Sequence, residues 1–231
     1  MAEFTRKEVL QMIAAVPGDQ MLNLAGFDLS GLDLSKVVLW RANLTGANLT
    51  GASLYHASLC NANLSGANLT GANLNHANLS NADLTEAHAG GANLNQANLS
   101  NANLTGAYLY DSKITEASFI GANLYRSNLG YANLTSSDLT NVNLCDANLV
   151  NANLGDADMR GADLQGADLR SADLTKTNLA NANLARADLG YARLVETDLS
   201  GASLRDANVG NAIISDPNLT GAIMPDGTIH S

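Results

Sequence analysis

A five-residue repeat runs through almost the whole chain and constrains its fold more than any other feature. From Leu24 to Met224 every fifth residue is apolar, which gives 41 positions, and 34 of them hold Leu. Two residues earlier, Ala fills 30 of the 41 positions, and Asn or Asp stands between the pair in 30 units. This period matches neither the 3.6 residues of an α-helical turn nor the two-residue alternation of an ordinary strand.

Each unit is therefore interpreted as three extended residues followed by a turn. Ala and Leu point inward, Asn or Asp between them points outward, and the last two residues form a corner. Four corners close a coil of about 20 residues, and successive coils pair through their backbones about 4.8 Å apart. We predict an all-β, four-sided solenoid of about ten coils that spans residues 22–226.

The composition fits a narrow interior filled with small and medium side chains. Hydrophobic residues make up 46% of the 231 residues, but aromatic residues make up only 4%. The apolar content is too high for a disordered chain. We found neither a membrane-spanning apolar run nor the hydrophobic region of a secretory signal, so we expect a cytoplasmic protein with no membrane partner. Cys60 and Cys145 are expected at exposed corners, too far apart for a disulfide.

The repeat unit A-(N/D)-L-x-x resembles the signature of the pentapeptide repeat family, and the resemblance covers Leu22 to Asp226. It implies a right-handed quadrilateral β-helix. The ending AIMPDGTIH, Ala222 to His230, is similar to that of cyanobacterial members, among them a regulator that suppresses heterocyst differentiation. The resemblance thus implies a cytoplasmic regulator.

The first residues predict a helical cap for the N-terminal end of the solenoid. Thr5 and Glu8 have the spacing of a capping box, and Phe4 and Val9 have that of a hydrophobic staple. Pro17 and Gly18 signal the end of the helix. We expect residues 1–21 to form this capping helix and a linker. Four large residues replace the inward Ala in the first coil and are expected to close its end: Leu22, Phe27, Leu32 and Val37.

The C-terminal end carries no comparable helix. Ile213, Ile214, Ile223 and Met224 enrich the last coil in apolar side chains, and residues 227–231 form a short tail. Some family members dimerise through this end. The sequence therefore leaves open a monomer or a homodimer joined at the C-terminal end.

No nucleophile, phosphate-loop or zinc-binding motif occurs, so we expect no enzyme activity, no cofactor and no metal. His56 and His76 are predicted to stack one coil apart without a third ligand, as part of a solvated surface. Ala89 replaces the inward Leu in the unit 87–91. This unit is either a local bulge, which offers a partner a loop, or a regular coil.

Most of the tyrosines gather in one short zone. Four of the six fall between residues 108 and 131, where the inward consensus also breaks at Ser112, Phe119 and Ser127. Exposed Tyr beside Arg is typical of protein–protein hot spots. We therefore predict that this zone binds another protein, whose identity the sequence does not give. The candidate residues are Tyr108, Tyr110, Lys113, Ile120, Tyr125, Arg126 and Tyr131.

The charge is concentrated in the C-terminal half. The net charge is −10, and residues 138–226 hold 13 Asp and Glu against 6 Lys and Arg. This excess argues against nucleic acid as a direct partner. Outward positions of the repeat form a predicted acidic band. It consists of Asp138, Asp158, Asp163, Asp168 and Asp173.

The acidic band raises an alternative function, because some pentapeptide repeat proteins bind DNA gyrase in place of duplex DNA. A duplex about 50 Å long, the expected length of the rod, carries roughly 29 charges. The net charge here is −10, and arginines interrupt the band. We therefore favour a rigid, noncatalytic scaffold that binds another protein, with the DNA mimic as the alternative.

Overall fold

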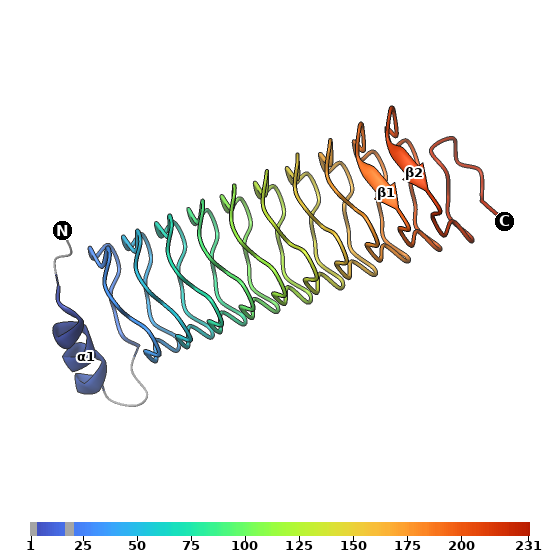
Figure 1. The fold of residues 1–231 in the computed structure, drawn as a ribbon. Coiled ribbons are helices and arrows are strands. Elements are labelled where there is room, and N and C mark those ends of the chain that lie inside the picture. The colour runs from blue at the N-terminus through green and yellow to red at the C-terminus, as the bar shows by residue number, and fades with distance from the viewer. Residues whose placement is uncertain (1–3, 17–20) are drawn as a thin grey trace.

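The computed structural model describes residues 4–16 and 21–231, and in it the chain forms a rod of stacked coils (Figure 1). Helix α1, Arg6–Ala15, lies at the N-terminal end of the rod, and the short strands β1, Arg193–Val195, and β2, Ile213–Ser215, lie near the other end. Pro17 and Gly18, the predicted helix-ending signal, fall outside the described residues. Within the described residues, no helix has the length and apolar character needed to cross a membrane.

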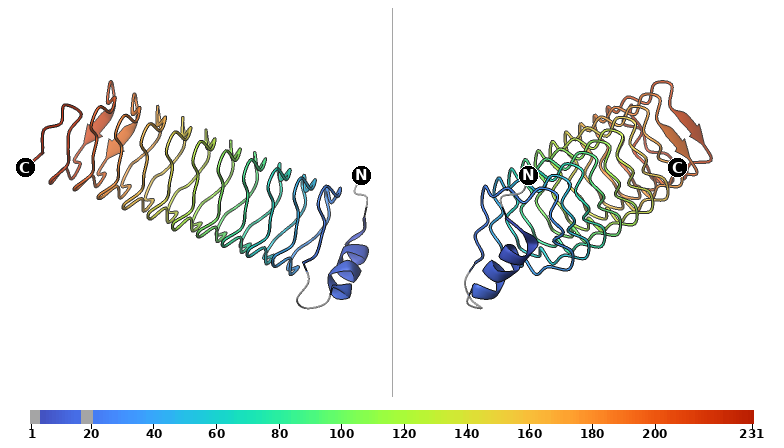
Figure 2. Two further views of the ribbon diagram at one scale, coloured as in Figure 1. Left: turned by 180° about the vertical axis from the view of Figure 1, so that it is seen from behind. Right: turned by 60° about the vertical axis from the view of Figure 1, so that its left-hand side comes forward.

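The predicted register is confirmed. Each outward residue pairs in parallel with the residue 20 positions later, in a series that runs from Asn23↔Asn43 to Ser203↔Ile223. β1 and β2 continue one of these ladders, with Arg193 paired to Ile213. The coils follow one axis in all views (Figure 2), and the fold is a right-handed quadrilateral β-helix.

The hydrogen bonds of one unit, residues 43–47, explain why the repeat has five residues. Two of its five backbone N–H groups donate to the next coil, one donates to the previous coil and one closes the turn. The fifth, from Thr45, donates to Oδ1 of Asn43 at 3.1 Å. Every backbone donor of the unit is thus satisfied without water.

The outward Asn or Asp therefore has a local role that the sequence interpretation missed. Its side chain forms an Asx turn with the first corner residue and fixes the corner. The outward side chains also form hydrogen bonds between coils in places, as where Nδ2 of Asn43 donates to Oδ1 of Asn23 at 3.0 Å. Because Asp accepts the same turn bond as Asn, both residues suit this position.

The core consists of the inward Leu and Ala layers, which are buried along the rod. The unit 87–91 is a regular coil and not a bulge, because Ala89 and Gly91 donate to the next coil at 2.7 and 2.9 Å. Phe119, whose side chain is fully buried, belongs to the next coil.

The two ends of the rod are closed differently. At the N-terminus the predicted capping box is present, since Thr5 Oγ1 accepts from the Glu8 amide and the Glu8 carboxylate accepts from the Thr5 amide. Phe4 stacks on Phe27 with the ring centroids 4.7 Å apart, which ties the helix to the first coil. At the C-terminus the tail folds back and pairs Ile229 antiparallel to Ile223.

Candidate protein-binding surface

Three tyrosines form a continuous aromatic surface at one corner of the β-helix. Tyr108 stacks on Tyr110 with the centroids 5.9 Å apart, and Tyr110 contacts Tyr131 at 5.3 Å. The 20-residue coil explains this arrangement, because Tyr131 follows the corner of Tyr110 by one coil. We call Tyr108, Tyr110 and Tyr131 the tyrosine patch. Their exposed fractions are 40%, 38% and 54%, so the patch is open to solvent.

Two glycines make room for these rings. A Cβ added at Gly90 would lie 2.9 Å from Cε1 of Tyr108, and one added at Gly130 would lie 3.3 Å from Cδ2 of Tyr110. Neither glycine has the positive φ of the second corner position, which non-glycine residues such as Asp111 and Tyr131 also adopt in this chain. Their role here is to let an aromatic ring lie close to the backbone.

Asp111 is the acidic group next to the patch. It is exposed and occupies the same corner position as Tyr131, one coil earlier. The pKa of Tyr110 is raised, first by partial desolvation, then by the neighbouring Tyr131 and Tyr108, and also by the Asp111 carboxylate. The patch thus combines aromatic faces with a nearby negative charge.

The remaining predicted residues do not all join the patch. Lys113 lies on the face that follows the patch corner, and Tyr125 lies with Arg126 at the other edge of the preceding face. The Arg126 guanidinium carbon is 4.8 Å from the centroid of the Tyr125 ring. Ile120 is two corners beyond Tyr110, which is the diagonally opposite corner of a four-sided coil. The expectation that Ile120 borders the tyrosines is therefore wrong.

The acidic band is spread over all four faces, and its carboxylates are largely used within the fold. All five members are half-buried, and each accepts the backbone N–H two residues later at 2.9 to 3.2 Å. Asp158 and Asp168 also bind Arg160 and Arg170, each at 2.6 Å. These arginines hold the pKa of both carboxyls below the ordinary value.

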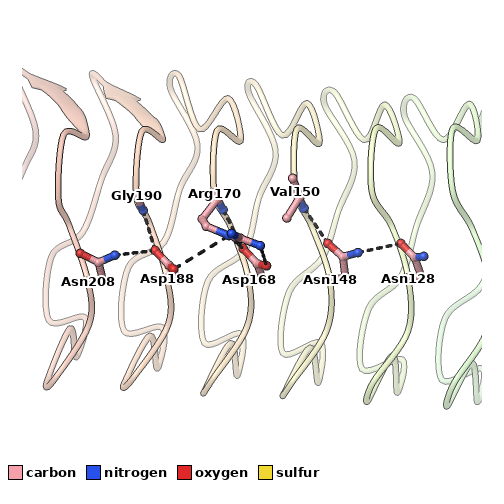
Figure 3. Close-up of polar contacts among 8 residues, drawn as sticks. All are labelled: Asn128, Asn148, Val150, Asp168, Arg170, Asp188, Gly190 and Asn208. Carbon is pink, nitrogen blue, oxygen red and sulfur yellow. Dashed lines mark hydrogen bonds and ion pairs between the residues drawn. The ribbon is translucent and has the colours of Figure 1, made fainter.

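The column that carries Tyr108 continues from Asn128 to Asn208 (Figure 3). Asn148 donates to Asn128 at 3.2 Å, and Arg170 lies between Asp168 and Asp188 (Figure 3). Arg170 binds Asp168 at 2.6 Å and lies 3.9 Å from Asp188. One arginine thus offsets two carboxylates that follow each other along the rod.

The histidine pair and the cysteines are not part of the patch. His56 and His76 stack as predicted, with the ring centroids 4.5 Å apart. Within the described residues, no group of three side chains suits a metal ion. Cys60 and Cys145 are free thiols as expected, but both are half-buried and not exposed. Burial, with the help of Asp163, raises the pKa of Cys145 to about 11.

Sequence reasoning missed Gly90, Gly130 and Asp111 as parts of this surface. Their positions within the 20-residue coil could have identified them. Both glycines occupy the first corner position, which does not need positive φ, and each is one coil away from a tyrosine. Counting by 20 residues also places Asp111 directly before Tyr131 in one column.

Comparisons with known proteins agree with this architecture. The family model of pentapeptide repeats matches overlapping segments that together cover residues 28–226. The search of curated proteins found no match.

Among solved structures, the chain is similar to HetL, a pentapeptide repeat protein involved in heterocyst differentiation regulation from the cyanobacterium Nostoc sp. strain PCC 7120. The identity is 34% with a TM-score of 0.61, over 99% of this chain and 100% of HetL. A pentapeptide repeat protein from the Arabidopsis thaliana thylakoid lumen matches at 31% identity and a TM-score of 0.39, over 44% of this chain and 68% of its own. QnrB1, a plasmid-mediated fluoroquinolone resistance protein, matches at 21% identity and a TM-score of 0.40, over 84% and 90%.

Proposed function

This chain belongs to the pentapeptide repeat family, and we propose that it is a rigid, noncatalytic scaffold that binds another protein through the tyrosine patch. The observation that carries the proposal is the contact of three solvent-exposed tyrosines over 5.9 and 5.3 Å. Tyrosines give large contact areas at a small cost in conformational entropy and are enriched in binding hot spots. The paired backbones hold these rings in place before any partner arrives, which lowers the cost of binding.

The similarity to HetL over the full chain supports a regulatory role for the complex. Regulation by binding needs a surface of fixed geometry and no reactive group. A cytoplasmic location is part of the proposal, because the two free cysteines suit a reducing compartment.

The proposal is tested by changing the patch without changing the coil. The variant Tyr110→Ser/Tyr131→Ser and the control Tyr191→Ser are compared with the unmodified chain in affinity capture from the source organism. Tyr191 is 66% exposed and lies on the same corner three coils beyond Tyr131, so it is a matched control. We expect the double variant to lose the captured partner and the control to retain it, with all three proteins equally stable. Full retention by the double variant would reject the patch.

The acidic band favours a second candidate, a DNA mimic that binds DNA gyrase. This candidate is weakened by two features of the band: Arg160 and Arg170 neutralise part of its charge, and all five of its carboxylates accept a backbone N–H. A gyrase supercoiling assay separates the two functions. Inhibition at micromolar protein supports the mimic, and unchanged supercoiling supports the scaffold.

The oligomeric state is the remaining part of the partner proposal. Ile213 and Ile214 of the last complete coil are 55% and 48% exposed. A homodimer joined at this end would bury both side chains. The alternative is a monomer in which they stay exposed. Sedimentation of the unmodified chain and of Ile213→Lys distinguishes the two: only a dimer at this end would dissociate on substitution.

A further inference from the structure

Aromatic residues at the first corner position follow a pattern that the tyrosine patch breaks. Four aromatic residues occupy the first corner position: Trp40, Tyr55, Tyr110 and Tyr125. In three of these corners the next residue contacts the ring and can carry a positive charge. Arg41 lies 5.1 Å from the Trp40 centroid, Arg126 lies 4.8 Å from that of Tyr125, and His56 meets Tyr55 edge-on at 4.3 Å. After Tyr110 the next residue is Asp111.

The corner of Tyr125 shows a complete arrangement of this kind. Arg126 lies over the Tyr125 ring and also faces the carboxylate of Asp146 in the next coil, 3.8 Å away. The guanidinium thus contacts an aromatic face and an acid together. The guanidinium thereby gains a cation–π contact and an ion pair at one site.

The corner of Tyr110 holds two of these three components. The aromatic faces are those of Tyr110 and Tyr131, and the acid is Asp111. Within residues 4–16 and 21–231, no cationic side chain forms a salt bridge with Asp111. The nearest lysine in the sequence, Lys113, belongs to the next face and forms no such bridge either.

We infer that the tyrosine patch and Asp111 together bind the guanidinium of an arginine that the partner protein carries. This inference rests on the proposed function and names the chemistry of the partner at that same site. Arginine fits better than lysine, because a planar guanidinium stacks on an aromatic ring while its N–H groups reach a carboxylate. The net charge of −10 also attracts a cationic segment from a distance.

The probe for this inference is N-acetyl-arginine amide, with N-acetyl-citrulline amide as the neutral control of nearly the same shape. The unmodified chain is titrated while the ring signals of Tyr110 and Tyr131 are followed by NMR. We expect saturable shifts with a dissociation constant on the order of 10 mM for the arginine compound, and none for the citrulline compound. Equal shifts with both compounds, or none with either, would overturn the inference.

Two variants make the test specific. Asp111→Asn should weaken arginine binding several-fold, because Asn keeps the corner conformation but removes the charge. Arg126→Ala should create a second arginine site, seen as new shifts of the Tyr125 ring, because Asp146 and Tyr125 then lack their own guanidinium. Unchanged arginine binding by Asp111→Asn contradicts the inference, as does the absence of new shifts in a stably folded Arg126→Ala variant.

Failure of this inference can be distinguished from failure of the proposed function. If Asp111→Asn retains the captured partner while Tyr110→Ser/Tyr131→Ser loses it, the tyrosines bind the partner by apolar contact and the arginine inference is wrong. If both variants retain the partner, the tyrosine patch is not the binding surface.

Discussion

The tyrosine patch and the acidic corner around Arg170 lie along the same edge of the β-helix and use it in opposite ways. Tyr110 and Arg170 occupy the same corner position, three coils apart. Arg170 binds Asp168 at 2.6 Å and lies 3.9 Å from Asp188, so the charges there offset one another. Asp111 forms no salt bridge within the described residues, and the rings beside it are exposed. The same edge thus carries a surface whose charges pair with one another and, three coils away, a surface suited to binding a partner.

The largest expected difference between the two regions lies in their cores. Phe119 and Met159 are fully buried in the same inward column, Phe119 in the coil that carries Tyr110 but on the opposite side of the rod, and Met159 at the acidic band. Truncation to Ala should cost about 3–5 kcal/mol at Phe119 and about 2–5 kcal/mol at Met159. We expect Phe119→Ala to be the more destabilising in urea denaturation, because it removes the larger buried side chain and leaves the larger cavity. A larger loss for Met159→Ala would contradict this packing.

The second comparison removes one carboxylate charge in each region. Asp168→Asn should lower the free energy of unfolding by about 0.5–1 kcal/mol, because Arg170 loses its charged partner at the surface. Asp111→Asn should leave it unchanged within about 0.3 kcal/mol, since no internal pairing is lost. Thermal unfolding at low salt measures both. Equal destabilisation would mean that Asp111 is used inside the fold after all.

The two regions should also respond to opposite ends of the pH scale. The pKa of Asp168 is lowered in the folded chain, chiefly by its hydrogen bond with Arg170. Its contribution to stability is therefore present above the ordinary Asp pKa and is lost as the pH falls through the lower, folded-state value. The pKa of Tyr110 is raised, so its contribution is present below the ordinary Tyr pKa of about 10 and is lost as the pH rises through the folded-state value.

Single variants assign these two pH responses. Asp168→Asn should flatten the loss of stability on acidification, and Tyr110→Phe should flatten the loss on the alkaline side. Urea midpoints measured across the pH range test both. A Tyr110→Phe chain with the same alkaline profile as the unmodified one would remove Tyr110 as the cause.

The smallest expected effect concerns the glycines beneath the patch. Gly90→Ala should displace the Tyr108 ring, because the new Cβ would lie 2.9 Å from Cε1. Gly190→Ala is the matched control, since its new Cβ would meet only polar atoms, the nearest of them Oδ1 of Asp188 at 3.1 Å. We expect stability to change by less than about 1 kcal/mol in both variants, with shifted Tyr108 ring signals only in Gly90→Ala. An unmoved Tyr108 ring would show that Gly90 is not required.

The repeat predicted the coil and its register because the spacing of the inward residues also determines which backbone groups form hydrogen bonds between coils. An inward pair every five residues fixes which amides face the next coil, so a residue such as Asn23 must pair with Asn43. The role of Asn43 as an acceptor for the Thr45 amide was not evident. An outward polar residue in a repeat is normally interpreted as solvent-exposed, but the Asn43 side chain accepts a backbone hydrogen bond that forms the corner.

The candidate site was predicted less well, because it depends on which side chains meet between coils. The zone 108–131 included the patch tyrosines, but proximity in sequence also brought in Ile120, which lies at the opposite corner. Ile120 follows Tyr110 by half of a 20-residue coil, so the length of the coil alone places the two residues at opposite corners. The roles of Gly90 and Asp111 depend on contacts of individual rings and charges, which the repeat does not specify.

Hydroxyl-radical footprinting of the chain with and without its captured partner tests the central claim most directly. Oxidation of each tyrosine side chain is measured by mass spectrometry on the unmodified protein. We predict that the partner protects Tyr108, Tyr110 and Tyr131 and leaves Tyr191, on the same corner, as reactive as in the free chain. Protection of Tyr191 with an unprotected patch would contradict the account.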